Sequence, residues 1–203
     1  MTHAHQLTLV LQRLEEQAAP PSHAARLRQI VSVVERHHPT AAIALVGSYA
    51  KGTGDRVSDL DLAVIADDSQ ADAVLENAHK VLHQGDVLNF FSGHHKSAGA
   101  FHKFVYLDFS SVELHVFPQS CAFRLKNPFL TVWDPQQLLP AYVTAGEPVR
   151  HEDFPAYEYG DEGLIWELVD CIKWLSRGNL PLAKQYLRKL GAELENTTAS
   201  GGK

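Results

Sequence analysis

Residues 44–65, ALVGSYAKGTGDRVSDLDLAVI, constrain this chain more than any other stretch, because they place two carboxylates inside an apolar segment. Asp59 and Asp61 are separated by one residue in a run that predicts a half-buried strand. Alternate residues of a strand face the same way, so both carboxylates lie on one face and Leu60 and Leu62 on the other. Like charges this close repel each other and are costly to desolvate, so a positive group is expected beside them.

A glycine-serine pair precedes these carboxylates. Gly47 and Ser48 end an earlier apolar run, where a glycine lets the backbone approach a ligand closely. The amides and the hydroxyl that follow can form an anion-binding nest, and Lys51 adds positive charge. The two aspartates suit a hard divalent cation. A nucleoside triphosphate carrying Mg²⁺ would engage both halves of such a site.

Length and charge narrow the function classes. A chain of 203 residues suits one domain of ordinary size with a small appended lobe. The formal charge of −6, from 18 basic and 24 acidic residues, argues against nucleic acid as a partner. We see neither a signal peptide nor an apolar run long enough to span a bilayer. The expectation is a cytoplasmic protein with no membrane partner.

The order of predicted elements indicates an α/β (α+β) fold with a mixed β-sheet core and flanking helices. Helical periodicity and β-rich runs predict two helices, two strands, a third helix and four further strands, at 7–14, 27–34, 42–46, 60–66, 70–83, 86–91, 101–109, 112–117 and 129–133. Asp134 and Pro135 are expected to start another helix.

A short helical lobe is expected after this core. Its first helix should present an apolar face from Leu164 to Leu175, and a second helix should cover 182–190. The last residues are small and polar, which is typical of disorder. The predicted organisation is a core at 1–145, a helical lobe at 146–195 and a disordered tail at 196–203.

The spacing of these motifs resembles the nucleotidyltransferase superfamily built on the polymerase-β-type palm. Its signature is Gly-Ser or Gly-Gly, a spacer of about ten residues, and then Asp-x-Asp or Asp-x-Glu. Here, ten residues separate Ser48 from Asp59. Members of that superfamily carry a third carboxylate on a later neighbouring strand. Glu113, in SVELHVF, is the candidate, and Asp108, at the end of its own strand, is the competitor.

A narrower resemblance concerns the segments GSYAKGTGDRVSDLDL and VWDPQQLL. They are similar to those of small bacterial enzymes that nucleotidylate aminoglycoside or lincosamide antibiotics, over about residues 41–139. The C-terminal lobe is short for that group. A second subunit is therefore a candidate source of a substrate lid, which makes a homodimer an expectation.

The resemblance implies a Mg²⁺-dependent transfer of a nucleoside monophosphate, AMP from ATP, onto a hydroxyl of a small molecule. The expected site residues fall into three groups: Asp59, Asp61 and Glu113 as catalytic residues holding two metal ions; Gly47, Ser48 and Lys51 at the nucleotide; and Glu167 and Asp170 as candidate base or acceptor-binding residues. Glu113 is also a candidate base. Lys51 as a plain loop lysine and His115 as a packing residue stay open as alternatives.

Two other functions remain at this stage. One is a protein-modifying nucleotidyltransferase that adenylylates a partner protein, as antitoxin-like relatives do. The other is a nucleotide-binding module without catalysis, against which three carboxylates argue. Residues 147–170 hold eight acids against one base, Arg150. Such a run is often only a solvated surface, but it also favours a cationic acceptor such as an aminoglycoside.

Overall fold

The computed structural model describes residues 3–95, 99–146 and 151–200. The chain forms two compact units, Met1–Glu147 and Pro148–Lys203, whereas the sequence placed this boundary after residue 145. Part of the acidic run, at 147–150, and the last part of the tail, at 201–203, lie outside the described residues. Among the helices described, none is long and apolar enough to cross a membrane.

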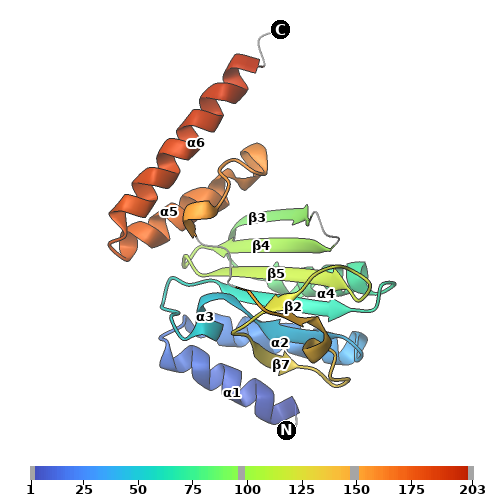
Figure 1. Ribbon diagram of the computed structural model, residues 1–203. Coiled ribbons are helices and arrows are strands. Elements are labelled where there is room, and N and C mark those ends of the chain that lie inside the picture. The colour runs from blue at the N-terminus through green and yellow to red at the C-terminus, as the bar shows by residue number, and fades with distance from the viewer. Residues whose placement is uncertain (1–2, 96–98, 147–150, 201–203) are drawn as a thin grey trace. The chain divides into compact units, whose positions relative to one another are not determined.

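A mixed sheet forms the centre of the first unit, as the sequence predicted. In the described residues it has six strands in the order β3-β4-β5-β2-β1-β7 (Figure 1). The central pair β2–β5 is parallel, and the other neighbours are antiparallel. The strands are β1 Ala42–Leu45, β2 Leu60–Ala66, β3 Val87–His94, β4 Ala100–Tyr106, β5 Ser111–Pro118 and β7 Leu130–Trp133.

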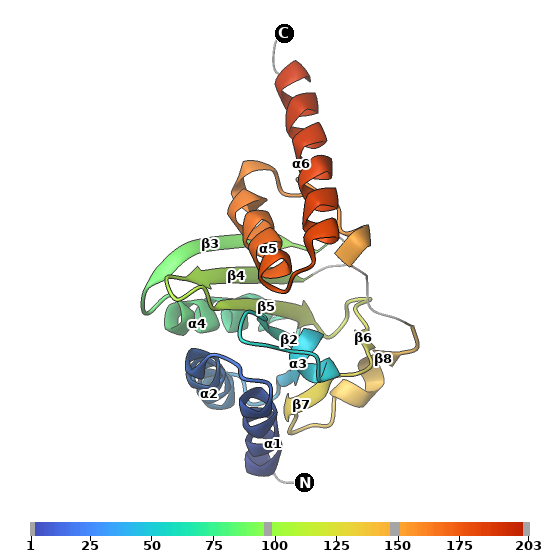
Figure 2. The ribbon, with the colours of Figure 1, turned by 90° about the vertical axis from the view of Figure 1, so that its left-hand side faces the viewer.

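Three amphipathic helices supply the main core of this unit. They are α1 His3–Glu16, α2 Pro21–His37 and α4 Ala71–Leu82, and Figure 2 shows α2 and α4 on the same side of the sheet. In β2, Leu60, Leu62 and Val64 are fully buried in the core that these helices share. Asp61 and Ala63 alternate with them and face the other way. The predicted separation of carboxylates and leucines is therefore observed.

The opposite face of the sheet is covered in part by the segment after β5. A second apolar cluster there includes Ala63 and Phe117. In the described chain, two short parallel strands, β6 Leu125–Lys126 and β8 Val143–Thr144, lie on that side (Figure 2). The sequence did not predict these strands, because two residues carry no periodicity.

The helix predicted to start at Asp134 is not formed. The carboxylate of Asp134 instead accepts the backbone N–H groups of Leu138 at 2.7 Å and Leu139 at 3.0 Å. Only a short 3₁₀ turn, η1 Leu139–Tyr142, follows. The aspartate thus caps a turn in place of a helix, and Pro140 has no N–H to extend it.

The second unit contains the two predicted helices, α5 Leu164–Ser176 and α6 Leu180–Ser200, preceded by η2 His151–Asp153 and η3 Gly160–Gly163. Its core is built from both helices, with Cys171, Trp174, Leu182, Ala183 and Tyr186 as members. Most of the predicted apolar stripe of α5 is instead exposed, at 44% for Ile165 and 51% for Ile172, although Val169 within it is buried. The helix has two apolar faces, and the face that carries Trp174 packs on α6.

The described chain stays helical beyond residue 195, where the sequence placed the start of a disordered tail. Helix α6 continues to Ser200. Within this stretch, the hydroxyl of Thr197 donates to the carbonyl oxygen of Glu193 at 2.9 Å. This bond joins two residues that lie one helical turn apart. The polar composition of the segment therefore does not interrupt the helix.

Candidate active site

The glycine-serine pair opens a short helix, α3 Gly47–Lys51, directly after β1. The N–H of Val46 donates to the carbonyl oxygen of Asp61 at 3.0 Å, so the end of β1 is tied to β2. Gly47 has φ +69°, and a Cβ placed there would lie 1.8 Å from Oδ2 of Asp61. Only a glycine at this position allows the backbone of the turn to lie so close to the carboxylate of Asp61.

The spacer between Gly47-Ser48 and the aspartates is held by side chains from two elements. Tyr49 is fully buried, and its hydroxyl donates to the carbonyl oxygen of Asp55 at 2.6 Å. Gln17, directly after α1, accepts the N–H of Gly54 at 2.6 Å and donates to the carbonyl oxygen of Tyr49 at 2.9 Å. The loop is therefore a fixed support that sets the distance from the turn to Asp59.

The structure brings the three predicted carboxylates together. Parallel pairing places Asp61 directly opposite Glu113, and Asp59 precedes β2 by one residue. One oxygen of each carboxylate lies within 4.8 Å of the others. The hydroxyl of the buried Ser111 donates to Oδ1 of Asp59. We call Asp59, Asp61 and Glu113 the acidic triad.

The competitor for the third position, Asp108, is not part of this group. It lies in the turn between β4 and β5, where its carboxylate accepts the N–H of Ser110 at 3.0 Å and the hydroxyl of Ser22 at 3.2 Å. Among the residues described, the acidic triad is the one set of three or more His, Cys, Asp and Glu side chains with metal-site spacing.

A lysine supplies positive charge beside the triad. Antiparallel pairing of β4 with β5 places Lys103 opposite Glu113, and its Nζ is 3.2 Å from Oε2 of that carboxylate. Both side chains are mostly buried, at 16% and 18% exposure. The sequence assigned the positive charge to Lys51, which is exposed on α3. The sequence does show a single lysine in the apolar run of β4. Assigning this lysine to the site, however, requires knowing that β4 lies next to β5 in the sheet.

Two histidines extend the polar network from Glu113. Nε2 of His115 lies 3.1 Å from the same Oε2, and Nε2 of His95 lies 3.0 Å from Nδ1 of His115. The ring of His95 stacks on Phe117 at 5.0 Å between centroids. Burial, and then the nearby His115 and Lys103, lower the pKa of His95 to about 4, so this ring is neutral near pH 7. His115 is therefore more than a packing residue.

The donor set of the triad fits a hard divalent cation. Its atoms are carboxylate oxygens, which Mg²⁺ prefers over nitrogen or sulfur ligands. The turn at Gly47 leaves no side chain between the backbone and Asp61. Ser48 and Lys51 follow on the same short helix, so the predicted nucleotide-binding residues adjoin the triad in sequence and through Gly47 in space.

Glu167 and Asp170 belong to the second compact unit and are engaged there. Glu167 is only 8% exposed, and it accepts the N–H of Tyr157 at 3.0 Å. Burial and the neighbouring Glu167 raise the pKa of Tyr186. Asp170 pairs with Lys173 at 3.3 Å. Glu167 therefore lies on the side of α5 that packs on α6, opposite the exposed residues Ile165 and Ile172. The roles of Glu167 and Asp170 as base or acceptor ligand stay predictions.

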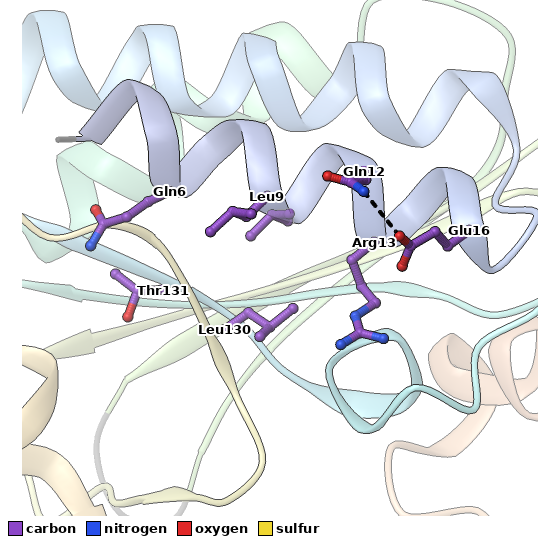
Figure 3. A pocket seen from close by; sticks show the side chains of 8 residues that line it. Gln6, Leu9, Gln12, Arg13, Glu16, Leu130 and Thr131 are labelled. Atoms are coloured by element: carbon purple, nitrogen blue, oxygen red, sulfur yellow. Dashed lines mark hydrogen bonds between the residues drawn. The ribbon is translucent and has the colours of Figure 1, made fainter. Parts of the chain in front are cut away.

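A groove of about 430 Å³ lies elsewhere in the first unit, between α1 and β7 (Figure 3). It is lined by Gln6, Leu9, Val10, Gln12, Arg13, Glu16, Leu130 and Thr131. None of the triad residues lines it, so it is not the candidate active site. In Figure 3, Arg13 points away from α1, and its Nη1 lies 3.8 Å from the Cβ position of Gly52, in the supporting loop.

Comparison with known proteins adds the enzyme class. Residues 27–106 match the family model described as a nucleotidyltransferase domain. The matched residues span β1, the Gly47-Ser48 turn, both aspartates of the triad and β4. The enzyme class predicted from the sequence is confirmed at the level of this domain. A search of curated proteins gave no match.

Solved structures similar to the chain include two nucleotidyltransferase systems. Cid1, described as having RNA terminal uridylyl transferase activity, aligns with a TM-score of 0.37 and 18% identity over 56% of this chain and 37% of that chain. The GLD-2/RNP-8 complex aligns with a TM-score of 0.35 and 16% identity over 57% and 44%. The chain therefore spans less than half the length of either protein.

Proposed function

We propose that the nucleotidyltransferase domain transfers AMP from ATP onto a hydroxyl of a small cationic molecule, such as an aminoglycoside, with Mg²⁺ as cofactor. The observation that carries the proposal is the acidic triad beside the Gly47-Ser48 turn, with its oxygens within 4.8 Å of one another. In this reaction, the acceptor oxygen bonds to the α-phosphorus while the bond from that phosphorus to pyrophosphate breaks.

The nucleotide would lie against the turn. The backbone of α3 and the hydroxyl of Ser48 would donate to the β- and γ-phosphates, and Lys51, exposed on the same helix, would add charge. The left-handed conformation of Gly47 removes the side chain that would block this approach. The family resemblance and the short spacing from turn to triad support these assignments.

Asp59, Asp61 and Glu113 would hold the metal ions. Two bound Mg²⁺ ions would lower the pKa of the acceptor hydroxyl and neutralise the pyrophosphate that leaves. The work of the chain itself is positioning: Ser111 orients Asp59, and the backbone pairing of β2 with β5 keeps Asp61 level with Glu113. The proton of the acceptor leaves to water or to a carboxylate in reach.

Charge supports the choice of acceptor. The chain carries a net charge of −6, which repels a polyanion such as RNA and attracts a polycation. The described part of the acidic run contributes exposed carboxylates, among them Glu152, Asp153 and Glu158. Aminoglycosides combine several ammonium groups with free hydroxyls, so they meet both requirements.

The test is a transfer assay on the full chain with Mg²⁺ and ATP labelled at the α-phosphate. Acceptors are a panel of aminoglycosides, a lincosamide, a short RNA and a cell lysate. We expect label on an aminoglycoside and none with Asp61→Asn, which keeps the size of the side chain but removes metal-binding charge. Label on the lincosamide, the RNA or a lysate protein would contradict the proposed acceptor. Absence of any transfer would contradict the proposed reaction.

A further inference from the structure

A chain of hydrogen bonds leads from the loop after β3 to the third carboxylate of the triad. His95 directly follows β3, its Nε2 lies next to Nδ1 of His115, and Nε2 of His115 lies next to Oε2 of Glu113. The distances are 3.0 Å and 3.1 Å. None of these histidines belongs to the metal-site set of the triad.

The carboxylate of Glu113 fixes the direction of the bond that it makes with His115. Glu113 as a carboxylate only accepts, so Nε2 of His115 must carry a proton and donate it. When His115 is neutral, its Nδ1 is an acceptor, and Nε2 of His95 donates to it. The lowered pKa of His95 agrees, because a neutral His95 can keep that single N–H aimed at His115.

Packing holds both rings in place. His115 shares a face of β5 with Glu113, and antiparallel pairing puts Phe101 opposite it. His95 lies 5.2 Å from the ring of Phe101 and stacks on Phe117. A glutamate has three rotatable side-chain bonds, so without such partners its carboxylate can adopt several positions. The two histidine rings therefore favour one of these positions of the Glu113 carboxylate.

We propose that His115, held in turn by His95, is a positioning residue that orients the carboxylate of Glu113 toward Asp59 and Asp61. The inference rests on the proposed function in one respect, which is that Glu113 is a metal ligand. Outer partners of metal ligands commonly change metal affinity by about 10- to 100-fold when they are removed. Asp59 has a different partner, Ser111, so the carboxylates of Asp59 and Glu113 are held by separate residues.

The experiment measures Mn²⁺ binding to the full chain, by the electron paramagnetic resonance signal of free Mn²⁺, without nucleotide. We expect His115→Ala to weaken binding by about tenfold. His115→Gln keeps an N–H donor of similar reach and should restore binding to within about threefold of the wild type. His95→Phe keeps the stacked ring but loses the donor, and should weaken binding less than His115→Ala.

The matched control is His102→Phe. His102 neighbours Lys103 in β4 but faces the helices, where its ring lies 5.0 Å from Phe90. This variant should bind Mn²⁺ like the wild type. Binding by His115→Ala equal to the wild type, or a loss that His115→Gln does not restore, would overturn the inference. Failure of the proposed role of Glu113 is distinguishable, because the wild type and Glu113→Gln would then bind Mn²⁺ equally.

Discussion

At the residue scale, Gly47 combines a left-handed backbone with a direct contact to a proposed metal ligand. Gly47→Ala should cost about 1–2 kcal/mol of stability for the backbone alone. It should also displace Asp61, whose Oδ2 would lie 1.8 Å from the new Cβ. We therefore expect loss of both Mn²⁺ binding and transfer activity, measured on purified protein that still melts cooperatively.

Gly178→Ala separates these two effects. Gly178 has φ +74°, close to that of Gly47, but a Cβ there would meet nothing within 4 Å. Its replacement should lower the melting temperature while leaving Mn²⁺ affinity at the wild-type value. Equal Mn²⁺ affinity of the Gly47→Ala protein and the wild type would show that the turn does not shape the triad.

Replacing Lys103 tests whether its charge or its hydrogen bond dominates, because the two effects change Mn²⁺ affinity in opposite directions. Lys103→Met removes one hydrogen bond to Glu113, worth about 1 kcal/mol, and one positive charge that competes with the metal. Two unit charges about 4 Å apart interact by roughly 4 kcal/mol at the effective dielectric near a protein surface, so the charge dominates. We expect Mn²⁺ to bind about tenfold more tightly, and the metal-free protein to melt at a lower temperature.

Lys103→Arg is the control for this substitution, because it keeps the charge. Its Mn²⁺ affinity should stay near that of the wild type, and calorimetry measures both variants under the same conditions. Weaker Mn²⁺ binding by Lys103→Met would mean that the lysine mainly orients Glu113 and that the charge argument is wrong.

At the element scale, α4 packs on β3 and β4 through a cluster of histidine and phenylalanine rings. His79 lies 5.1 Å from His102, and Phe90 contacts both. Burial, and then the neighbouring His79, lower the pKa of His102 to about 4 from its ordinary value of 6.5. The stability that depends on neutral His102 is therefore complete above pH 6.5 and is lost as the pH falls from 6.5 toward 4.

We expect the urea midpoint of the wild type to fall between pH 7 and pH 5, with His102 contributing about 1–2 kcal/mol to the loss. His102→Phe keeps the ring contacts but has no titrating group, so its midpoint should fall less over the same interval. Parallel pH profiles for the two proteins would contradict this explanation.

Element prediction succeeded where one periodicity dominates. The alternation of β2 gave the correct faces for Asp61 and Leu62, because a strand has only two faces. It failed for α5, since a helix with two apolar sides does not reveal which side packs on α6. It also failed at Asp134, where the same side chain that can start a helix caps a short turn.

At the scale of the whole molecule, the net charge of −6 predicts how an acceptor responds to salt. If the acceptor is a polycation, its apparent KM should rise several-fold from low to high ionic strength, because salt screens attraction beyond about 8 Å at physiological concentration. The measurement is initial rate against acceptor concentration at saturating ATP. A KM independent of salt would contradict the electrostatic argument.

The candidate site was predictable only in part, and the reason lies in the order of strands. Asp59, Asp61 and Gly47-Ser48 belong to one local motif, so the sequence shows them together. Glu113 could be assigned only through the family resemblance. His115 follows from the alternation of β5, because it lies two residues after Glu113. Lys103 and His95 join the site because β4 and β3 lie beyond β5 in the sheet, and local periodicity does not contain that order.

The central parallel pair also sets when the site can exist during folding. The bond from Ser111 to Asp59 spans 52 residues, and a parallel pair requires a crossover before its strands can meet. Contacts of such long range form slowly, because the intervening chain must first lose its freedom. A nascent chain that ends before β5 carries the full local motif but lacks its third carboxylate. The proposed metal site would thus be complete only when the centre of the sheet closes.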